Sequence, residues 1–346
     1  MIAGGSSLRR IRDAFFAIGP STYEFKRIGG VPMKANFSLV LVSLLLVGVV
    51  PVAVAQTPNI WSSGAPIPTA VYGPAVAVLN GEIYVIGGTN ADNAIIADTQ
   101  IYDPATNSWS TGVSLPTPVE GASAAAVKGI IYVMGGTTSG GVYNYTDAVW
   151  ALAPVTQTWY RRAAMPTALH DAGIAVEGNI IYVIGGNSNS NLRADTVESF
   201  NPATDTWTEE APLLVGKSEP TVGLVGATIV AADGLTQTTD TGDNEGYDVS
   251  TNTWTSLTSD PTPRSGACGG RIGARLYVAG GFYGSSPALQ LAKFFTLSTN
   301  AWKKFPPMPQ AALFQGSAVY QGNLYCFGGQ NAFDGTVLNN VQIYQP

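Results

Sequence analysis

Short apolar segments alternate with polar turns along most of the chain. In a typical unit the apolar run PAVAVL (residues 74–79) reaches Asn80-Gly81 and is followed by EIYVIGG (residues 82–88). An Asn-Gly pair between two apolar runs is the strongest short-range signal for a β-hairpin. The glycine pair at the end permits backbone angles and close approaches that a Cβ would forbid. The pattern therefore predicts short antiparallel strands joined by tight turns, rather than long helices.

This unit recurs with a fixed period. Six of the seven tryptophans are separated by 48, 50, 48, 47 and 48 residues, at positions 61, 109, 159, 207, 254 and 302. Between them a strand that ends in two glycines recurs in step, and only its fourth copy decays, to IVAADG at residues 229–234. A third strand leads to each tryptophan through a turn such as DPATNSW (residues 103–109). Each period therefore predicts four short strands, which bury both faces only against neighbouring copies.

The glycine pair, a Tyr or Phe and a Trp seven residues after that aromatic resemble the kelch repeat, over residues 57–346. The resemblance implies an all-β, six-bladed kelch-type β-propeller. The last copy ends at Pro346 without a tryptophan strand, whereas the strand around Trp61 has no copy before it. We therefore expect the N-terminal strand to complete the last blade and close the ring, which removes free sheet edges.

The segment before the repeats has the pattern of an export signal. Residues 37–55 carry no charge, follow Met33-Lys34, contain Pro51 and end in Ala53-Val54-Ala55. Such an order is typical of a cleaved signal peptide at residues 33–55, and the alternative is a membrane anchor at residues 37–55. Residues 1–32 are then a non-native or disordered extension before a start at Met33. We expect residues 56–346 to form the propeller in a secreted or periplasmic protein.

Charge narrows the classes of partner. The chain has 17 basic and 23 acidic side chains, a formal net charge of −6. Residues 1–34 hold six of the basic and two of the acidic ones, so the remainder has 11 against 21 and a charge near −10. Nucleic acids and anionic lipids select clustered Lys and Arg, which are absent here. We expect no nucleic-acid partner and no membrane contact beyond the N-terminal segment.

The candidate site lies where the inner strands begin. In a propeller the loops after the glycine pairs and those that follow the tryptophan strands emerge on one face, which is the expected binding surface. Counting eleven residues from each tryptophan gives one position in every blade, and the adjacent positions add further polar and aromatic groups. The resulting candidates for ligand binding are Tyr72, Glu120, His170, Asp171, Glu219, Arg264, Phe314 and Gln315, with Ser218, Ser265 and Leu313 at the remaining equivalent positions. The alternative is that these groups only solvate the mouth of the channel and pair with one another.

The sequence contains no residue pattern typical of a metal or cofactor site. Galactose oxidase also carries kelch repeats, but its copper centre needs two histidines and this chain has only His170. Asp240, Asp243, Glu245 and Asp248 do not follow the order of an EF-hand, so we expect a solvated acidic loop. Cys268 and Cys326 fall in apolar strands of neighbouring blades, and we expect two buried free thiols, with a disulfide as the alternative. We expect no metal and no cofactor.

Two functions of different classes fit these features. The leading hypothesis is an exported, monomeric, non-catalytic propeller that recognises a glycan or a protein through its loop face. The alternative is a metal-free sugar isomerase that resembles the periplasmic six-bladed kelch mutarotase of sialic acid. That resemblance implies roles for Glu120, His170 and Arg264 as base, acid and carboxylate clamp. The long insertions associated with that enzyme are missing here.

Overall fold

The computed structural model describes residues 59–139, 144–190, 192–284, 289–331 and 333–346. The chain divides into two compact units, residues 1–54 and 55–346, and all described residues belong to the second. The expected extension at residues 1–32 and the expected signal at residues 33–55 therefore lie outside the described residues. Within the described part, no helix has the length and hydrophobicity that a membrane crossing requires.

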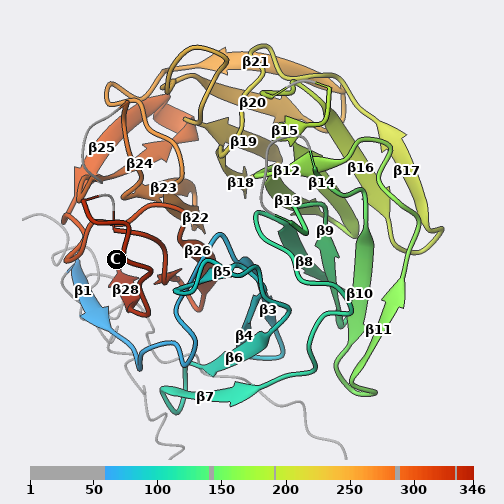
Figure 1. Cartoon of the computed structure of the whole chain (residues 1–346). Coiled ribbons are helices and arrows are strands. Elements are labelled where there is room, and N and C mark those ends of the chain that lie inside the picture. The colour runs from blue at the N-terminus through green and yellow to red at the C-terminus, as the bar shows by residue number, and fades with distance from the viewer. Residues whose placement is uncertain (1–58, 140–143, 191, 285–288, 332) are drawn as a thin grey trace, which may run out of the picture. The chain divides into compact units, whose positions relative to one another are not determined.

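Six four-stranded antiparallel sheets are arranged as blades around a centre (Figure 1). We number the blades 1 to 6 in chain order from residue 75. The innermost strands are β3 (Ala75–Leu79), β8 (Ser123–Val127), β13 (Gly173–Glu177), β18 (Thr221–Val225), β22 (Cys268–Ile272) and β26 (Gly316–Tyr320). Each inner strand contacts the next, and β26 contacts β3 again, so the ring is closed.

The other three strands of each blade follow outward in order. The second strands are β4 (Glu82–Ile86), β9 (Ile130–Met134), β14 (Ile180–Ile184), β19 (Thr228–Ala232), β23 (Arg275–Ala279) and β27 (Asn323–Phe327). The third strands are β6 (Thr99–Asp103), β10 (Val149–Ala153), β16 (Val197–Asn201), β20 (Asn244–Asp248), β24 (Ala292–Thr296) and β28 (Val341–Gln345). The outer strands are β7 (Ser108–Thr111), β11 (Thr158–Arg161), β17 (Thr206–Glu209), β21 (Thr253–Leu257), β25 (Ala301–Phe305) and β1 (Ile60–Ser63), and one 3₁₀ turn, η1 (Leu297–Thr299), precedes β25.

The N-terminal strand closes the ring as the sequence predicts. β1 pairs antiparallel with β28, with Trp61 opposite Tyr344, and so forms the outer strand of blade 6. The predicted hairpin turns are also present. Asn80 and Gly81 both have positive φ, 53° and 92°, as a two-residue turn of the primed type requires. Local sequence therefore set the strands, and the pairing of the two chain ends completed the sixth sheet.

The core consists of six apolar clusters, and each cluster lies at the junction of two neighbouring blades. The tryptophans act as scaffold at these junctions. Each indole N–H donates to the carbonyl of the residue four positions after the tryptophan of the preceding blade, at 2.8 to 3.1 Å. The bond from Trp61 to the Pro306 carbonyl, 2.8 Å, closes this circle across the two ends of the chain.

Two constraints explain the glycine pair: its residues have positive φ, and neighbouring backbone atoms lie where a Cβ would be. Gly136 has a φ of +87°, and a Cβ there would lie 2.6 Å from the Glu120 carbonyl oxygen in the strand start of its own blade. The decayed fourth copy places Asp233 at the first position of the pair with a φ of +59°. That substitution is accommodated by buried charges, which are described below.

The expectation of two free thiols was wrong. Cys268 on β22 and Cys326 on β27 form a disulfide between blades 5 and 6, with Cα atoms 5.8 Å apart. Both residues are fully buried. The sequence placed the cysteines correctly in neighbouring sheets. Only the packing of those sheets decided that the two side chains face each other across the junction.

Candidate binding site

The six positions selected by counting from the tryptophans are structurally equivalent. Each lies just before an inner strand and pairs with the residue that follows the glycine pair of its own blade. Two blades form two-stranded ladders there, β2 (Val71–Tyr72) with β5 (Thr89–Asn90) and β12 (Leu169–His170) with β15 (Asn187–Ser188). The other four form single bridges, Glu120 with Thr137, Ser218 with Leu235, Ser265 with Phe282 and Leu313 with Gln330. We call this end of the central channel the mouth.

A circle of backbone hydrogen bonds runs around the mouth through the next residue of each blade. These six residues all have φ between 55° and 63° and are Gly73, Gly121, Asp171, Glu219, Gly266 and Phe314. Five bonds of 2.8 to 2.9 Å join neighbours, including Asp171 N–H to the Gly121 carbonyl and Glu219 N–H to the Asp171 carbonyl. Non-glycine residues cost energy in this region of backbone space and concentrate at functional sites. Asp171, Glu219 and Phe314 therefore mark where the mouth carries side chains.

His170 is held between two carboxylates at the mouth. Its Nε2 lies 3.0 Å from Glu120 Oε2 in the preceding blade, and its Nδ1 lies 2.8 Å from Asp171 Oδ2. The ring of Tyr145 stacks on the imidazole with centroids 4.9 Å apart and planes 10° apart. Two carboxylates and a ring face thus fix the imidazole, so His170 is a partly buried, paired group rather than a solvated one.

These contacts shift the titration of the three groups. Burial by itself lowers the pKa of His170, but the charges and hydrogen bonds of Asp171 and Glu120 outweigh it and raise that pKa to about 11. Burial raises the pKa of Glu120 against the opposing effect of His170. The imidazole is therefore protonated at neutral pH and offsets one carboxylate charge.

Glu219 and Gln315, together with Ser218, are mouth residues with unused hydrogen-bonding capacity. Glu219 Oε2 is buried without a hydrogen-bond partner, and both polar atoms of the Gln315 side chain are in the same state. Gln315 is only 8% exposed. Both residues line a cavity of about 130 Å³ over the backbone circle, which also touches Asp171 and Phe314. Burial and the charge of Asp171 raise the pKa of Glu219 to about 8, so this group is largely a proton donor at neutral pH.

An aromatic arc occupies the opposite side of the mouth. Phe314 lies 6.4 Å from Tyr72 and 5.8 Å from Phe282, between ring centroids. Below the mouth, the inner strands enclose a channel of about 600 Å³ that is lined mainly by Ala, Val and Gly, with Gln315 at its rim. The site thus offers an acidic side, an aromatic side and unpaired amide and carboxyl groups between them.

Sequence comparison matches residues 55–232, slightly more than half of the chain, to the KLHDC2/KLHL20/DRC7 Kelch-repeats domain. The chain belongs to the kelch-repeat family. Kelch domains generally bind proteins, so this membership suggests a protein-interaction role.

Individual relatives agree with this family. Human Kelch-like protein 15 is 26% identical over 166 residues, which are 42% of this chain and 28% of that protein. Kelch-like protein terF of Aspergillus terreus is 28% identical over 158 residues, 42% of this chain and 34% of that protein. The matches therefore span about a third or less of each relative. The solved structure of YjhT superposes with a TM-score of 0.69 at 18% identity, covering 81% of this chain and 96% of that one, which shows a shared fold.

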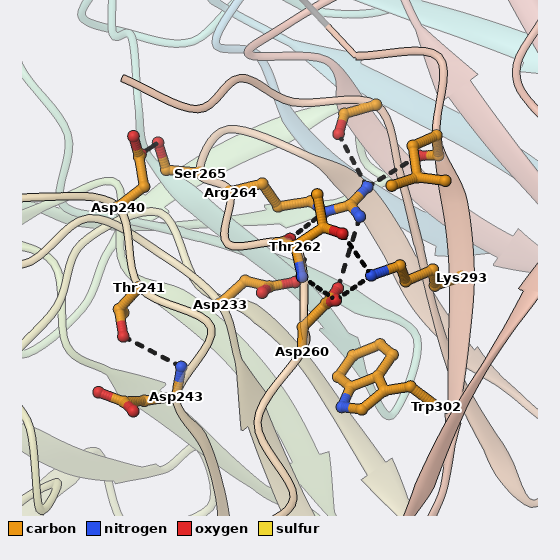
Figure 2. A network of polar contacts seen from close by, with 12 residues as sticks. Asp233, Asp240, Thr241, Asp243, Asp260, Thr262, Arg264, Ser265, Lys293 and Trp302 are labelled. Carbon is orange, nitrogen blue, oxygen red and sulfur yellow. Dashed lines mark hydrogen bonds and ion pairs between the residues drawn. The ribbon is translucent and has the colours of Figure 1, made fainter.

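The structure removes Arg264 from the ligand-binding candidates of this kelch propeller. Its side chain is fully buried and points into the junction of blades 4 and 5 (Figure 2). The guanidinium donates to the carbonyl oxygens of Leu291 and Gly280, at 2.8 and 3.3 Å, and lies 3.4 Å from Asp260 Oδ2. It therefore fastens the segment that leads into blade 5 to the strands of that blade and, being fully buried, is not exposed to a ligand in the mouth.

Blades 4 and 5 hold further buried charges. Lys293 pairs with Asp260, and Lys217 pairs with Glu245 at 2.9 Å. Asp233 has neither carboxylate oxygen hydrogen-bonded, and burial and the charge of Asp260 raise its pKa well above the ordinary value. Lys217 and Arg264 occupy the position that is apolar in the other four blades, as Val71, Val119, Leu169 and Ala312. The charges thus replace apolar side chains in blade 4, whose glycine pair has decayed to Asp233-Gly234, and in the next blade.

The acidic loop of blade 4 is solvated only in part, because Asp248 is exposed whereas Asp240 and Glu245 are buried, contrary to the expectation for these two residues. Asp240 is buried and accepts bonds from the Ser265 hydroxyl at 2.6 Å and the Gly284 N–H at 2.5 Å. Glu245 is buried against Lys217. Among the described residues, the group with metal-ligand spacing is Glu120, His170 and Asp171, whose ligand atoms lie within 4.8 Å of one another. A metal there would have to displace the imidazole proton that both carboxylates stabilise.

Three side chains near the mouth were not among the sequence candidates. Phe282 follows a glycine pair directly, so the register of the repeat could have identified it. Tyr145 and Arg193 lie in loops of unequal length, in which no register exists. The charge of Arg193 acts on Glu219 and lowers its pKa against the effect of burial. The mouth therefore holds two cationic groups, His170 and Arg193, together with three carboxyl groups.

We predict that His170 stays protonated far above the ordinary histidine range. It is the one histidine of the chain, so its imidazole carbon shifts can be followed directly by NMR. They should remain those of imidazolium between pH 6.5 and about 11. In the unfolded chain the imidazole of His170 titrates near pH 6.5. The contacts of protonated His170 with Asp171 and Glu120 therefore stabilise the fold fully below that pH, and their contribution declines as the pH rises toward 11. The His170→Gln variant should lack this part of the pH dependence of Tm. An imidazole titration with a midpoint near pH 6.5 in the unaltered protein would contradict the raised pKa of His170.

Proposed function

We propose that this kelch propeller is a non-catalytic binding module whose mouth receives a neutral polar group of a glycan or of a protein partner. The observation that carries the proposal is the pair of unpartnered, buried groups at the mouth, Glu219 Oε2 and the Gln315 carboxamide. Buried polar atoms without partners are uncommon and each requires an explanation. A ligand that supplies the missing hydrogen bonds is such an explanation.

The charges of the mouth favour a neutral group over an ion. His170 and Arg193 are cationic, Asp171 and Glu120 lie against His170, and Glu219 with a pKa of about 8 is mostly uncharged at neutral pH. A hydroxyl or amide can accept from protonated Glu219 and exchange hydrogen bonds with Gln315. The aromatic arc of Tyr72, Phe282 and Phe314 adds an apolar surface for a ring or a side-chain face.

Loss of either unpartnered group should weaken binding without loss of the fold. Gln315→Ala and Glu219→Ala should each reduce affinity about five- to tenfold, as expected for one hydrogen bond worth about 1 kcal/mol. Ligands are sought by glycan array and by pull-down with the mature protein, and affinities are then measured by calorimetry. Glu209→Ala, at an exposed residue on the outer strand β17, is the matched control. Unchanged affinity in both mouth variants would reject the mouth as the binding surface.

Arg264 provides a contrasting control. Removal of one partner from a buried ionic network costs about 3–5 kcal/mol, so Arg264→Ala should lower Tm strongly. Any effect of this variant on binding should follow from reduced stability.

A second candidate function, acid–base isomerisation of a sugar, has one observation in its favour. The mouth contains a carboxyl group with a pKa of about 8 beside a protonated histidine, and catalytic acids and bases work best with a pKa near the operating pH. Arg264 cannot serve as the carboxylate clamp, because it is buried. Arg193 would have to take that role.

A measurement of catalytic turnover distinguishes the binding module from the isomerase. For the isomerase, proton NMR of freshly dissolved sialic acid should show faster interconversion of the anomers with the protein than without it, and Glu219→Gln should abolish the acceleration. An unchanged rate with the unaltered protein would end this candidate. The binding proposal is independent of that outcome.

Export of the chain is part of the proposal. The uncharged segment 37–55 ends in the small-residue pattern of a cleavage site. The Cys268–Cys326 disulfide supports it, because such bonds persist mainly in oxidising compartments. Mass spectrometry of the protein from its native host should then find a mature chain that begins at Gln56. A chain that retains residues 37–55 and sediments with membranes would favour the anchor instead.

A further inference from the structure

Each blade receives a short segment from the outer strand of the preceding blade, and a polar side chain of its third strand usually fastens that segment. We call these segments straps. They are residues 67–69, 115–117, 165–167, 213–215, 260–262 and 308–310. The fastening position has the same register in every blade, opposite the fourth residue of the second strand. It is occupied by Gln100, Trp150, Glu198, Glu245, Lys293 and Gln342 in blades 1 to 6.

Two blades show what the last strap residue requires. In blade 1, Gln100 Oε1 accepts from the Thr69 N–H at 2.8 Å and its Nε2 donates to the Thr69 carbonyl at 3.1 Å. In blade 6, Gln342 makes the same two bonds with the backbone of Gln310, at 2.8 and 3.0 Å. A carboxamide thus satisfies the donor and the acceptor of one strap residue at once.

Three further blades fasten the strap with charged groups. Glu245 accepts from the backbone N–H groups of Leu214 and Val215, at 2.7 and 3.3 Å. Lys293 donates to the Thr262 hydroxyl at 2.8 Å. Glu198 is hydrogen-bonded to Thr167. Five of the six blades therefore fasten the strap with a polar side chain, all at one register position.

Blade 2 is the exception, because its third strand carries Trp150 at this position. Within the described residues, no protein group pairs with the backbone N–H or carbonyl of Thr117, the strap residue equivalent to Thr69. A pocket of about 130 Å³ lies there, between the strap and the third strand. It is lined by Thr117, Pro118, Val119, Val133, Trp150 and Arg161, among others. An engineered apolar cavity of about 150 Å³ holds benzene, so this pocket has the size of one ring.

We propose that the pocket beside Trp150 binds a small planar ring that bears a primary carboxamide. The carboxamide takes the place of the missing Gln side chain and bonds both backbone groups of Thr117, as Gln100 and Gln342 do in their blades. The ring lies against the indole and the apolar side chains of Val119 and Val133. The proposal is independent of the function proposed for the mouth.

The charges at the rim favour an amide over a carboxylate. The Arg161 guanidinium lies over the Trp150 ring at 5.2 Å, and Asp147 lies 3.9 Å from it. This cation therefore already has an aromatic and an anionic neighbour. A carboxylate would also direct an acceptor at the Thr117 carbonyl, whereas an amide presents a donor there.

Titration of the protein with benzamide, benzoate and acetamide tests the chemical class. Amide spectra by ¹H–¹⁵N NMR should show benzamide shifting the Thr117 N–H and the Trp150 indole N–H. Benzoate, which lacks the donor, and acetamide, which lacks the ring, should bind at least tenfold more weakly. Benzoate binding as tightly as benzamide, or the absence of shifts with benzamide, would overturn the proposal.

A repeat-guided variant tests the location. Trp150→Gln supplies the carboxamide found in blades 1 and 6, so the strap should be fastened internally and benzamide affinity should fall at least tenfold while Tm is kept or raised. Tyr160→Gln, at an exposed position on β11 outside the pocket, should leave benzamide affinity unchanged. Retained affinity in Trp150→Gln would overturn the proposal.

Two measurements keep the test decisive. If Trp150→Gln does not fold, the unaltered protein is used instead. Nuclear Overhauser contacts between benzamide protons and the Trp150 indole would then support the proposed location, and their absence would overturn the proposal. Gln315→Ala, which alters the mouth, should leave benzamide affinity unchanged. Failure of mouth binding is thereby distinguished from failure of this site.

Discussion

Burial of apolar sheet faces between neighbouring blades is the interaction on which the rest of this structure depends. A four-stranded blade has two apolar faces and cannot hide both alone. Each of the six core clusters is shared by two blades, so no blade has a core of its own. The ring must close for every face to be covered, and the pairing of β1 with β28 and the bond from Trp61 to the Pro306 carbonyl achieve this.

Closure also creates the mouth. Six inner strands that begin at one end of the ring bring six backbone segments to a common centre, where they hydrogen-bond in a circle. The backbone there has positive φ, which glycine adopts without strain. Asp171, Glu219 and Phe314 adopt it with side chains, so one side of the mouth is acidic and the other aromatic. These three residues are thus held by hydrogen-bonded backbone at the starts of the inner strands, rather than at loop tips.

Departures from the repeat are informative because the repeat fixes what each position normally does. Lys217 and Arg264 replace apolar residues at the equivalent positions of blades 4 and 5, and the buried carboxyl groups of Asp233 and Asp260 accompany them. These groups form a structural network. Trp150 departs in the opposite direction, since it replaces a polar fastening group and leaves a pocket with unpaired backbone atoms. The first departure is compensated within the protein, whereas the second one is not.

The sequence by itself determined the strands, the number of blades, the closure by the N-terminal strand and the equivalence of Tyr72, Glu120 and His170, because all of these follow from local patterns repeated at a fixed spacing. Only the tertiary structure decided that Arg264 is buried, that Cys268 bonds Cys326 and that Tyr145 stacks on His170. These facts depend on which side chains of different blades face each other. Such contacts join residues that are distant in the sequence, and Tyr145 also lies in a loop without a common register, so no local pattern encodes them.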